Sequence, residues 1–414
     1  MSEARGRGGA STLVAAFLHF STSCMAWVLL GALGIYIAAE SDLSPRAMGL
    51  VVAVPILSGS LLRIPLGQLG DRLGAKRLGG WMLALLAIPV LVALVGGRSL
   101  TGLLVIGAML GIAGASFAVA LPLASRWYPA ERQGLVLGLV AAGNTGTVIT
   151  YFLAPRIAER VGWHAAAASL LIPLLVTLVL FLVLAREAPK SAARARVEGA
   201  PSILRQPDLW IMGILYAVTF GGYVGMGASL PLLIRDQYAT GAVGAGSIAA
   251  LAGLFGGLTR PLGGYLADRL GGARVLSALL VALGAAYHFA ARLPALGTLA
   301  VLLCIAMLCM GLGNGAVFQL VPRRFPRELG AATGWVGAIG GAGGCVLPLL
   351  LGFVRELRGS VAPALTMLGV AAFGAAALVA ILLAMHEGWR TTWRVVVPAP
   401  DRQPELHPSG VDLG

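Results

Sequence analysis

The chain has 414 residues, of which 58% are hydrophobic and only 11% are charged. A soluble protein usually carries about 25% charged residues, so this composition excludes an ordinary water-soluble domain and indicates a polytopic membrane protein. The formal net charge is +13, but the basic residues are spread over short loops and do not gather with aromatic residues on a polar domain. The charge therefore does not indicate nucleic-acid binding.

Twelve apolar stretches follow one another along the chain, each long enough to cross a hydrocarbon core of about 30 Å as a helix. The first stretch follows Arg5 and Arg7 but is too long for the apolar core of a signal peptide. The sequence thus predicts an all-α polytopic membrane protein. Its transmembrane helices are expected at residues 12–38, 47–69, 79–97, 101–125, 133–155, 165–185, 209–234, 243–267, 275–291, 297–321, 329–354 and 362–385.

Lysine and arginine are distributed unevenly between the two ends of these helices. The side that would hold both termini carries 20 of the 30 basic residues, the opposite side carries 8, and the remaining 2 lie within helices. Basic residues are enriched in cytoplasmic loops. The sequence therefore predicts a protein of the cell inner membrane with both termini in the cytoplasm.

Five cations and three prolines interrupt the apolar pattern between the sixth and seventh predicted helices. This composition indicates a cytoplasmic linker between two halves of six helices. The expected units are a cytoplasmic N-terminus over 1–11, an N-terminal half over 12–186, the linker over 187–208, a C-terminal half over 209–385 and a disordered cytoplasmic tail over 386–414.

Two segments 197 residues apart are nearly alike and support this division. Leu62-Arg63-Ile64-Pro65-Leu66-Gly67 precedes Asp71-Arg72-Leu73-Gly74, and Thr259-Arg260-Pro261-Leu262-Gly263-Gly264 precedes Asp268-Arg269-Leu270-Gly271. Parallel six-helix repeats joined by a polar loop are the plan of the major facilitator superfamily, whose substrate sites lie near the bilayer midplane between the halves. The predicted architecture is therefore a major facilitator fold.

The two Asp-Arg-Leu-Gly turns resemble the superfamily's signature loop, which carries no information about the substrate. A carboxylate at a helix end can accept N–H groups of a neighbouring helix and pair with arginine. We therefore expect Asp71, Arg72, Asp268 and Arg269 to bias the conformation on the cytoplasmic side, and not to contact the substrate.

Arg63 and Arg260 lie about two turns deeper, roughly 10 Å from the ends of their helices at 1.5 Å per residue. Helical side chains lean toward the N-terminus, so both guanidinium groups should point toward the midplane. None of the 17 acidic residues falls well inside a predicted helix, so pairing with a buried acid is not expected. Two buried arginines predict a central site for a planar anion such as a carboxylate, nitrate or nitrite.

Further segments resemble the nitrate/nitrite porter family. They are Ala142-Gly143-Asn144-Thr145-Gly146-Thr147 in the fifth helix and the glycine run from Gly334 to Gly344 in the eleventh. The opening helix from Phe17 to Gly31 and the seventh helix from Tyr216 to Gly221 are similar to that family as well. With the two arginines, the resemblance extends over about residues 12–385.

The resemblance implies that the two arginines clamp the anion, and that an asparagine of the fifth helix and aromatic side chains of the fourth and seventh helices complete the site. By spacing alone, core packing is the favoured interpretation of the aromatic residues, and the asparagine fits an interhelical hydrogen bond equally well. The substrate-binding residues implied are Arg63, Arg260, Asn144, Tyr216, Phe220 and Phe117.

Charge constrains how such a porter is coupled. Moving one nitrate into a cell with an inside-negative potential costs about 2.3 kcal/mol per 100 mV, so uptake needs protons or a counter-anion. Without a buried carboxylate, nitrate/nitrite exchange is the main expectation. Ser21 stands where the proton-coupled branch of the family has an aspartate, and the nearby His19 keeps nitrate/proton symport as an alternative. A porter for another small organic anion is a further alternative.

Neither a cofactor nor a metal is expected, and an enzyme is not expected, because no metal-ligand cluster, nucleophile–base pair or cofactor motif is present. The cysteines lie within predicted helices and lack CxxC spacing: Cys24, Cys304, Cys309 and Cys345. The expected partners are the lipid bilayer and a small inorganic anion, nitrate or nitrite. The protein is expected to be a monomer.

Overall fold

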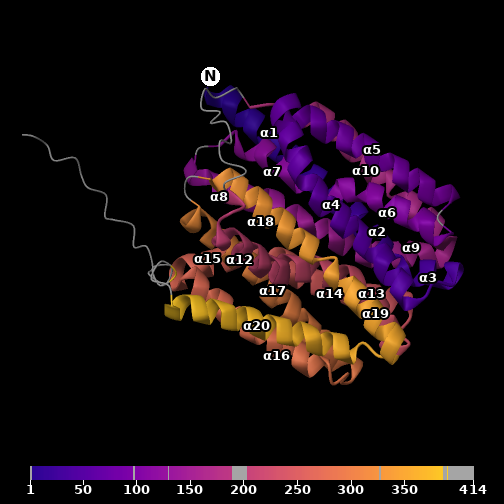
Figure 1. Cartoon of the computed structure of the whole chain (residues 1–414). Helices are drawn as coiled ribbons and strands as arrows, with labels where there is room; N and C mark the ends of the chain where they lie inside the picture. Colours follow the sequence, from indigo (N-terminus) through magenta and orange to yellow (C-terminus); the bar gives the residue numbers. More distant parts are fainter. Residues whose placement is uncertain are drawn as a thin grey trace, which may run out of the picture.

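The computed structural model describes residues 2–96, 98–128, 130–188, 203–325, 328–385 and 389. Within these ranges the chain forms helices joined by short loops and contains no strand. Figure 1 shows the helices of the first half, in indigo to magenta, gathered on one side of the molecule, and those of the second half, in pink to yellow, on the other. The all-helical fold class is confirmed.

The first half supplies six crossings of the bundle. The interruptions within single crossings are short, as between α6 and α7 or between α8 and α9. Its helices are α1 Ser2–Trp27, α2 Leu29–Ala32, α3 Gly34–Ser41, α4 Pro45–Leu73, α5 Ala75–Val95, α6 Leu100–Gly114, α7 Phe117–Ser125, α8 Ala130–Ala141, the 3-10 turn η1 Ala142–Thr145, α9 Gly146–Ser169 and α10 Leu171–Leu184.

The first crossing differs from the single helix predicted over residues 12–38. α1 begins before this range, and the helix is interrupted at Val28 and Leu33. A Cβ atom on Gly31 would lie only 2.5 Å from the carbonyl oxygen of Ala228 in the other half. The two interruptions therefore flank the point where the backbone packs directly against α13, a contact that hydropathy does not register.

The second half also supplies six crossings. The seventh crossing contains a π-helical stretch, and the eighth is divided between α14 and α15. Its helices are α12 Pro207–Tyr216, the π-helix η2 Ala217–Gly221, α13 Gly222–Tyr238, α14 Ala242–Leu258, α15 Arg260–Leu270, α16 Gly272–Ala290, α17 Leu296–Arg324, α18 Leu329–Gly343, α19 Val346–Arg358 and α20 Ala362–Met385.

Eleven helical stretches of the described chain are long and apolar enough to cross a membrane, and one of them, Val136–Leu184, has 49 residues. A helix of that length would measure about 74 Å, more than twice the thickness of a hydrocarbon core. Gly162 lies within it at φ 80° and ψ 161°, a conformation that glycine adopts readily. The chain turns there and crosses twice, which gives the twelve crossings predicted.

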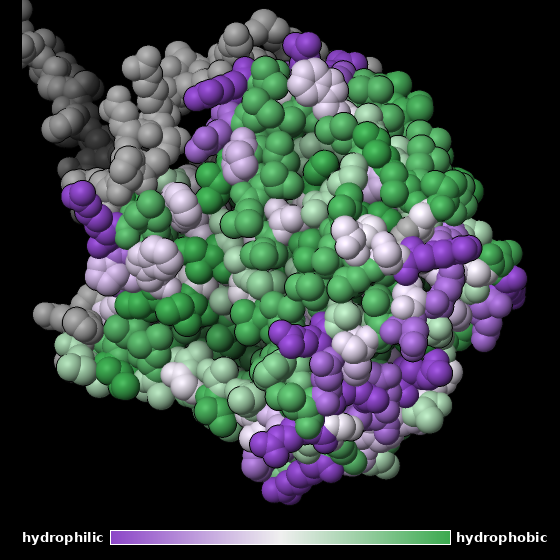
Figure 2. All heavy atoms as spheres, turned by 45° about the vertical axis from the view of Figure 1, so that its right-hand side comes forward, coloured by the Kyte–Doolittle hydropathy of each residue, from purple (hydrophilic) through white to green (hydrophobic). Residues whose placement is uncertain are grey.

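An even number of crossings places the start of α1 and the end of α20 on the same side, which we call the termini side; the opposite side is the far side. The termini side is at the left in Figure 1. Figure 2 shows a broad hydrophobic surface with hydrophilic residues gathered toward its edges. Large apolar side chains such as Ile172, Val183 and Val370 are exposed at the surface of the protein. The protein is thus a multi-pass membrane protein whose apolar surface faces lipid.

Most of the predicted linker and tail lies outside the described residues, since 189–202, 386–388 and 390–414 are not described. Trp389 is described and is buried. Its indole N–H donates to Asp208 Oδ1 at 3.4 Å, and its ring lies 4.9 Å from Arg324 Cζ. At this residue the chain beyond α20 packs against the starts and ends of other helices.

Candidate anion site

Arg63 is held in place inside the bundle. α4 runs without a break from Pro45 to Leu73, and the Arg63 side chain within it is 6% exposed. Its Nε donates to the Gly114 carbonyl oxygen at 3.1 Å, and its Nη1 donates to the Gly337 carbonyl oxygen at 2.9 Å. Gly114 belongs to the same half and Gly337 to the other half, so this guanidinium connects the two.

Arg260 is placed by a break in the eighth crossing. α14 ends at Leu258 and α15 begins at Arg260, with Thr259 between them. The break has a local cause, because Pro261 disfavours the helical conformation at the residue before it. The Arg260 side chain is half-buried. Among the described residues, no carboxylate lies within ion-pair distance of either guanidinium.

One aromatic ring lies against both guanidinium groups. The Phe117 ring centroid is 5.6 Å from Arg63 Cζ and 5.4 Å from Arg260 Cζ. Arg63 Cζ also lies 4.9 Å from the centroid of the Phe220 ring, and Arg260 Cζ lies 5.0 Å from the centroid of the Phe318 ring. Ring faces stabilise a desolvated cation by up to about 2 kcal/mol each. The structure therefore brings the two arginines together around a shared ring.

The rings of Tyr216 and Phe220 stack on each other next to the two arginines. Their ring centroids are 4.9 Å apart with an interplanar angle of 5°. Tyr216 directly precedes η2 and Phe220 lies within it, where the wider π-helical turn changes the register of the crossing. The Tyr216 hydroxyl lies beside Arg260. A Cβ atom on Gly340 would be 2.2 Å from Tyr216 Cδ1, so the glycine run of α18 makes room for this ring.

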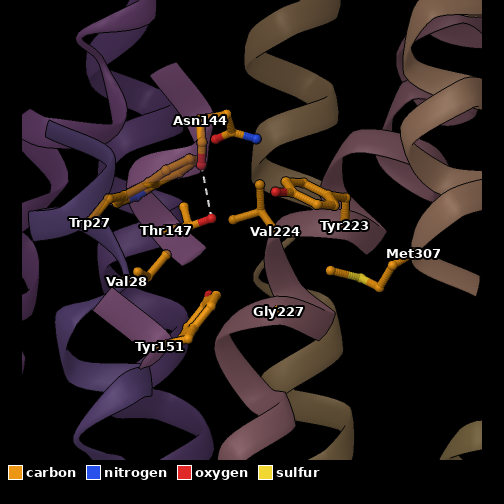
Figure 3. A pocket seen from close by; sticks show the side chains of 9 residues that line it. All are labelled: Trp27, Val28, Asn144, Thr147, Tyr151, Tyr223, Val224, Gly227 and Met307. Atoms are coloured by element: carbon orange, nitrogen blue, oxygen red, sulfur yellow. Dashed lines mark hydrogen bonds between the residues drawn. The ribbon is translucent and has the colours of Figure 1, made fainter. Parts of the chain in front are cut away.

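Asn144 lies in η1, next to α1 of the same half. A Cβ atom on Gly146 would be 2.0 Å from the Ser21 carbonyl oxygen, so the glycines around η1 let it sit against that helix. The Asn144 Oδ1 accepts a hydrogen bond from the Cys24 thiol at 3.5 Å. Asn144 lines a small cavity together with Trp27 (Figure 3), and the Trp27 ring lies 5.6 Å from Arg63 Cζ.

Comparison with known proteins identifies the family of the chain. A family model described as Major Facilitator Superfamily matches residues 15–348 and 214–401. The chain is 34% identical over 366 residues to the "Nitrite extrusion protein" of Bacillus subtilis, covering 88% of this chain and 91% of that protein. The chain belongs to the nitrate/nitrite porters of the major facilitator superfamily. These proteins are secondary transporters, so the chain is not an enzyme.

Two further relatives agree with this assignment. The porter is 36% identical to the "Probable nitrate/nitrite transporter NarK2" of Mycobacterium tuberculosis, covering 84% of this chain and 89% of that one. It is 31% identical to the "Probable nitrate/nitrite antiporter NarK1" of Thermus thermophilus, covering 83% and 84%.

The fold is shared with a solved structure. The porter is similar to a bacterial homologue of the human lysosomal transporter Spinster, solved in an inward-facing and occupied conformation. The TM-score is 0.67, the sequence identity is 16%, and the match covers 92% of this chain and 96% of that one. At this identity the similarity concerns the fold alone, and it confirms the major facilitator fold.

His19 is not brought to the arginine cluster. Its side chain is fully buried, its Nε2 lies 3.1 Å from the Gly79 carbonyl oxygen, and its ring centroid is 4.9 Å from that of Phe181. Gly79 belongs to α5 and Phe181 to α10. His19 therefore packs among helices of the first half, away from the face that holds Arg63.

The predicted gating residues form pairs within each half of the porter. Asp71 Oδ1 lies 2.5 Å from Arg126 Nη2, and Asp268 Oδ1 lies 3.9 Å from Arg323 Nη2. These pairs repeat at an interval of 197 residues. Their partners, Arg126 and Arg323, were not predicted as gating residues. Both pairs connect the second and fourth crossings of their own half on the termini side.

Their neighbours Arg72 and Arg269 are exposed on the termini side. Arg269 Cζ lies 4.5 Å from the centroid of the Tyr265 ring on its own helix. Within the described residues, no ion pair on the termini side joins the two halves. In this conformation the predicted gating residues therefore do not connect one half to the other.

The far side holds polar contacts between the halves that sequence reasoning missed. Glu356 at the end of α19 caps the start of α4, where its Oε2 accepts from the Ser44 hydroxyl at 2.6 Å and the Arg46 N–H at 3.1 Å. These hydrogen bonds hold the pKa of the Glu356 carboxyl below its ordinary value. Arg156 Nη2 donates to the Ser247 hydroxyl across the same interface at 2.8 Å. The porter is closed at its far side.

Phe318 and the two carbonyl oxygens bound to Arg63 were also missed. Gly114 precedes Phe117 by three residues, and Gly315 precedes Phe318 by the same spacing in the corresponding crossing of the second half. This repeated spacing could have revealed Phe318. The carbonyl oxygens carry no sequence signal, because every residue has one and only packing aims it at a partner.

Proposed function

We propose that the porter binds nitrate or nitrite between Arg63 and Arg260 and carries it across the inner membrane by alternating access. The supporting observation is that two guanidinium groups lie against one ring, Phe117, with no carboxylate of the described residues within ion-pair distance. Two uncompensated cations in an apolar interior attract an anion strongly. The printed names of the relatives, nitrate and nitrite transporters, agree with this substrate class.

A planar anion suits the groups that surround this position. Guanidinium presents parallel N–H donors in one plane, which match two oxygens of nitrate or nitrite. The rings of Phe117, Tyr216 and Phe220 surround this position with apolar groups and hold the guanidinium groups in place. The amide of Asn144 supplies further donors near Trp27.

The contacts between the two halves indicate how the porter could alternate between its conformations. The far side is closed by Glu356 and Arg156, whereas the ion pairs of Asp71 and Asp268 stay within their halves on the termini side. We place both termini in the cytoplasm on the basis of the basic loops, so this conformation faces inward. The halves 12–186 and 209–385 then rock as two bodies of a monomer, and the Asp71 and Asp268 pairs set the balance between conformations.

We propose nitrate/nitrite exchange as the mode of coupling. An empty site would leave two positive charges without a counter-ion as the porter passes through its occluded state, which is unfavourable in a low dielectric. A bound anion lowers this cost, so alternation is fast only when the site is loaded. His19 is hydrogen-bonded within the first half, and this position gives no support to a proton path through the site.

Counterflow in proteoliposomes tests the proposal. Vesicles filled with nitrite should take up labelled nitrate rapidly, and anion-free vesicles should take it up slowly whatever the pH gradient. Acetate should compete poorly with nitrate, since a porter for small organic acids would accept both. Accumulation into anion-free vesicles under an imposed inward proton gradient, abolished by His19→Gln, would reject exchange in favour of nitrate/proton symport.

A further inference from the structure

Asn314 is a buried amide to which the proposed site gives no role. It lies within α17, its side chain is 3% exposed, and its Oδ1 has no hydrogen-bond partner among the described residues. A polar atom without a partner is costly in an apolar interior, so its presence there requires a physical explanation. The nearest candidate partners are the groups on the side of α17 that carries Asn314.

That side of α17 is turned toward Arg260. Four residues share it at i, i+3, i+4 and i+7 spacing: Gly311, Asn314, Gly315 and Phe318. A Cβ atom on Gly315 would lie 2.2 Å from the Arg260 carbonyl oxygen, and the Phe318 ring centroid is 5.0 Å from Arg260 Cζ. Asn314 therefore lies about one helical turn, on the same face, from the ring that contacts Arg260.

The internal repeat supports this placement independently. The offset of 197 residues holds for the glycines that bring the second and fourth crossings of each half together, where a Cβ atom added to one would lie 2.9 Å or 2.2 Å from the backbone of the other. They are Gly59 with Gly114, and Gly256 with Gly311. At this offset Asn314 corresponds to Phe117, whose ring lies against both guanidinium groups. The second half thus has an amide where the first has the shared ring.

Arg260 also lacks the acceptor that its counterpart has. The Arg63 Nε donates to the Gly114 carbonyl oxygen, whereas Arg260 donates to no carbonyl oxygen of the described residues and has the Tyr216 hydroxyl beside it. A guanidinium has five N–H donors, and an amide oxygen accepts up to two hydrogen bonds. The remaining donors of Arg260 and the unpartnered Oδ1 of Asn314 are therefore chemically matched.

We propose that Asn314 is a positioning residue of the anion site, whose Oδ1 accepts a hydrogen bond from the Arg260 guanidinium when the anion is bound. The inference rests on the proposed function, because the anion is the nitrate or nitrite of that site. The anion takes one edge of the guanidinium, and Asn314 takes a donor that remains. Asn314 then holds Arg260 in the loaded porter as the Gly114 carbonyl oxygen holds Arg63.

Thermal melts of the purified full-length porter, with and without nitrate, test this role. Asn314→Leu keeps the size of the side chain and removes the amide. Without nitrate the variant should melt at the wild-type temperature or above it, because the amide has no partner to lose. The rise in melting temperature at a fixed nitrate concentration should be smaller than in the wild type, because the dissociation constant increases about tenfold.

Transport kinetics separate positioning from direct contact with the anion. In Asn314→Leu the KM for nitrate should rise about tenfold, while the rate at saturating nitrate stays within about twofold. The KM for nitrite should rise by the same factor, because the effect acts through Arg260. A loss confined to nitrate would mean that the amide donates to the third oxygen, which nitrite lacks, and would overturn the positioning role.

Gln319→Met is the matched control, because Gln319 also lies on α17 with both amide atoms buried and without a partner among the described residues. Its Oε1 faces Gly272 of α16, where a Cβ atom would lie 2.3 Å away. This variant should keep the wild-type response to nitrate.

Two results in Asn314→Leu would overturn the inference. One is a normal nitrate response with a lower melting temperature, which would make the amide a purely structural group. The other is a variant that matches the wild type in every measurement. A wild-type porter whose melting temperature does not respond to nitrate would instead contradict the proposed function.

Discussion

Arg63 and Arg260 occupy equivalent positions in the repeat but differ in how they are held. Arg63 lies within an unbroken helix and donates to two carbonyl oxygens, one from each half. Arg260 opens a new helix after a break, is half-buried and stands between the Phe117 and Phe318 rings. In the proposed site Arg63 is therefore a fixed arm, whereas Arg260, which has the Tyr216 hydroxyl beside it but no hydrogen bond to a carbonyl oxygen of the described residues, is a freer one.

The difference has its origin in the sequence around each arginine. Proline follows Arg260 directly, but it follows Arg63 one residue later, after Ile64. Proline restrains the residue before it, so the break falls at the arginine itself only in the second half. In the function proposed above, a nearly symmetric repeat would therefore supply one anchored arginine and one that can follow the anion when the halves rock.

The largest expected effect comes from the arginines. Arg63→Lys and Arg260→Lys should each nearly abolish nitrate exchange, because an ammonium group lacks the planar fork of guanidinium. Only Arg63→Lys should also lower thermal stability, by about 1–3 kcal/mol, since it leaves two buried carbonyl oxygens without their donor. Exchange assays and thermal melts of the purified variants would measure both effects.

Arg98→Lys is the matched control, because this side chain is 80% exposed on the far side. It should change neither transport nor stability. Wild-type nitrate affinity in either of the two site variants would contradict the clamp. Equal losses of stability in Arg63→Lys and Arg260→Lys would contradict the distinction between a fixed and a free arm.

The next largest effect should come from the ring that the arginines share. Phe117→Ala should weaken nitrate binding about tenfold, because it removes a contact with both cations, whereas Phe318→Ala affects only Arg260 and should cost a few-fold. Titration calorimetry would measure the dissociation constants. Phe289→Ala, whose ring faces Arg292, serves as the control. A larger loss from Phe318→Ala would reverse the assigned roles.

Substitutions in the ion pairs on the termini side should have a smaller effect on exchange, and the two pairs should again differ in the size of that effect. Asp71→Asn should slow exchange several-fold and Asp268→Asn less, since the first pair is closer, 2.5 Å against 3.9 Å. Exposed pairs contribute little energy, so the dissociation constant for nitrate should remain within a few-fold. If equilibrium binding collapsed in Asp71→Asn with the fold intact, Asp71 would belong to the site.

The contact that joins the halves on the far side should make a small, pH-dependent contribution. The Glu356 carboxyl has a pKa held below its ordinary value, so its contribution to closure is full above that value and is lost as the pH falls through the lowered pKa. Closure measured by labels across the far side should stay constant from neutral pH to about pH 5. Opening already near neutral pH, absent in Glu356→Gln, would contradict this assignment.

The smallest effect is expected at His19. The offset of 197 residues matches His19 to Tyr216, yet Tyr216 reaches the arginines and His19 packs against Gly79 and Phe181. His19→Gln can keep a hydrogen bond to the Gly79 carbonyl oxygen, so nitrate/nitrite exchange should change less than twofold. Tenfold slower exchange with normal stability would give His19 a role in transport.

The sequence by itself determined the membrane class, the twelve crossings and the repeat, because these depend on hydropathy and on the glycine and proline residues that end or interrupt helices. It also supplied the candidate residues. Arg63 and Arg260 stand out because charge inside an apolar span is rare, and Phe117 and Asn144 came from the resemblance to a family. The structure brings Arg63, Arg260 and Phe117 into contact, and Asn144 lies beside Trp27, whose ring contacts Arg63.

Tertiary structure decided which partners each of these side chains has. The carbonyl oxygens of Gly114 and Gly337, the Phe318 ring and the cap that Glu356 provides to α4 depend on packing between segments far apart in the sequence. Hydropathy and motif spacing describe one helix at a time. The hydrogen bond from Arg63 to Gly337, and the closure of the far side, arise where helices of different halves meet.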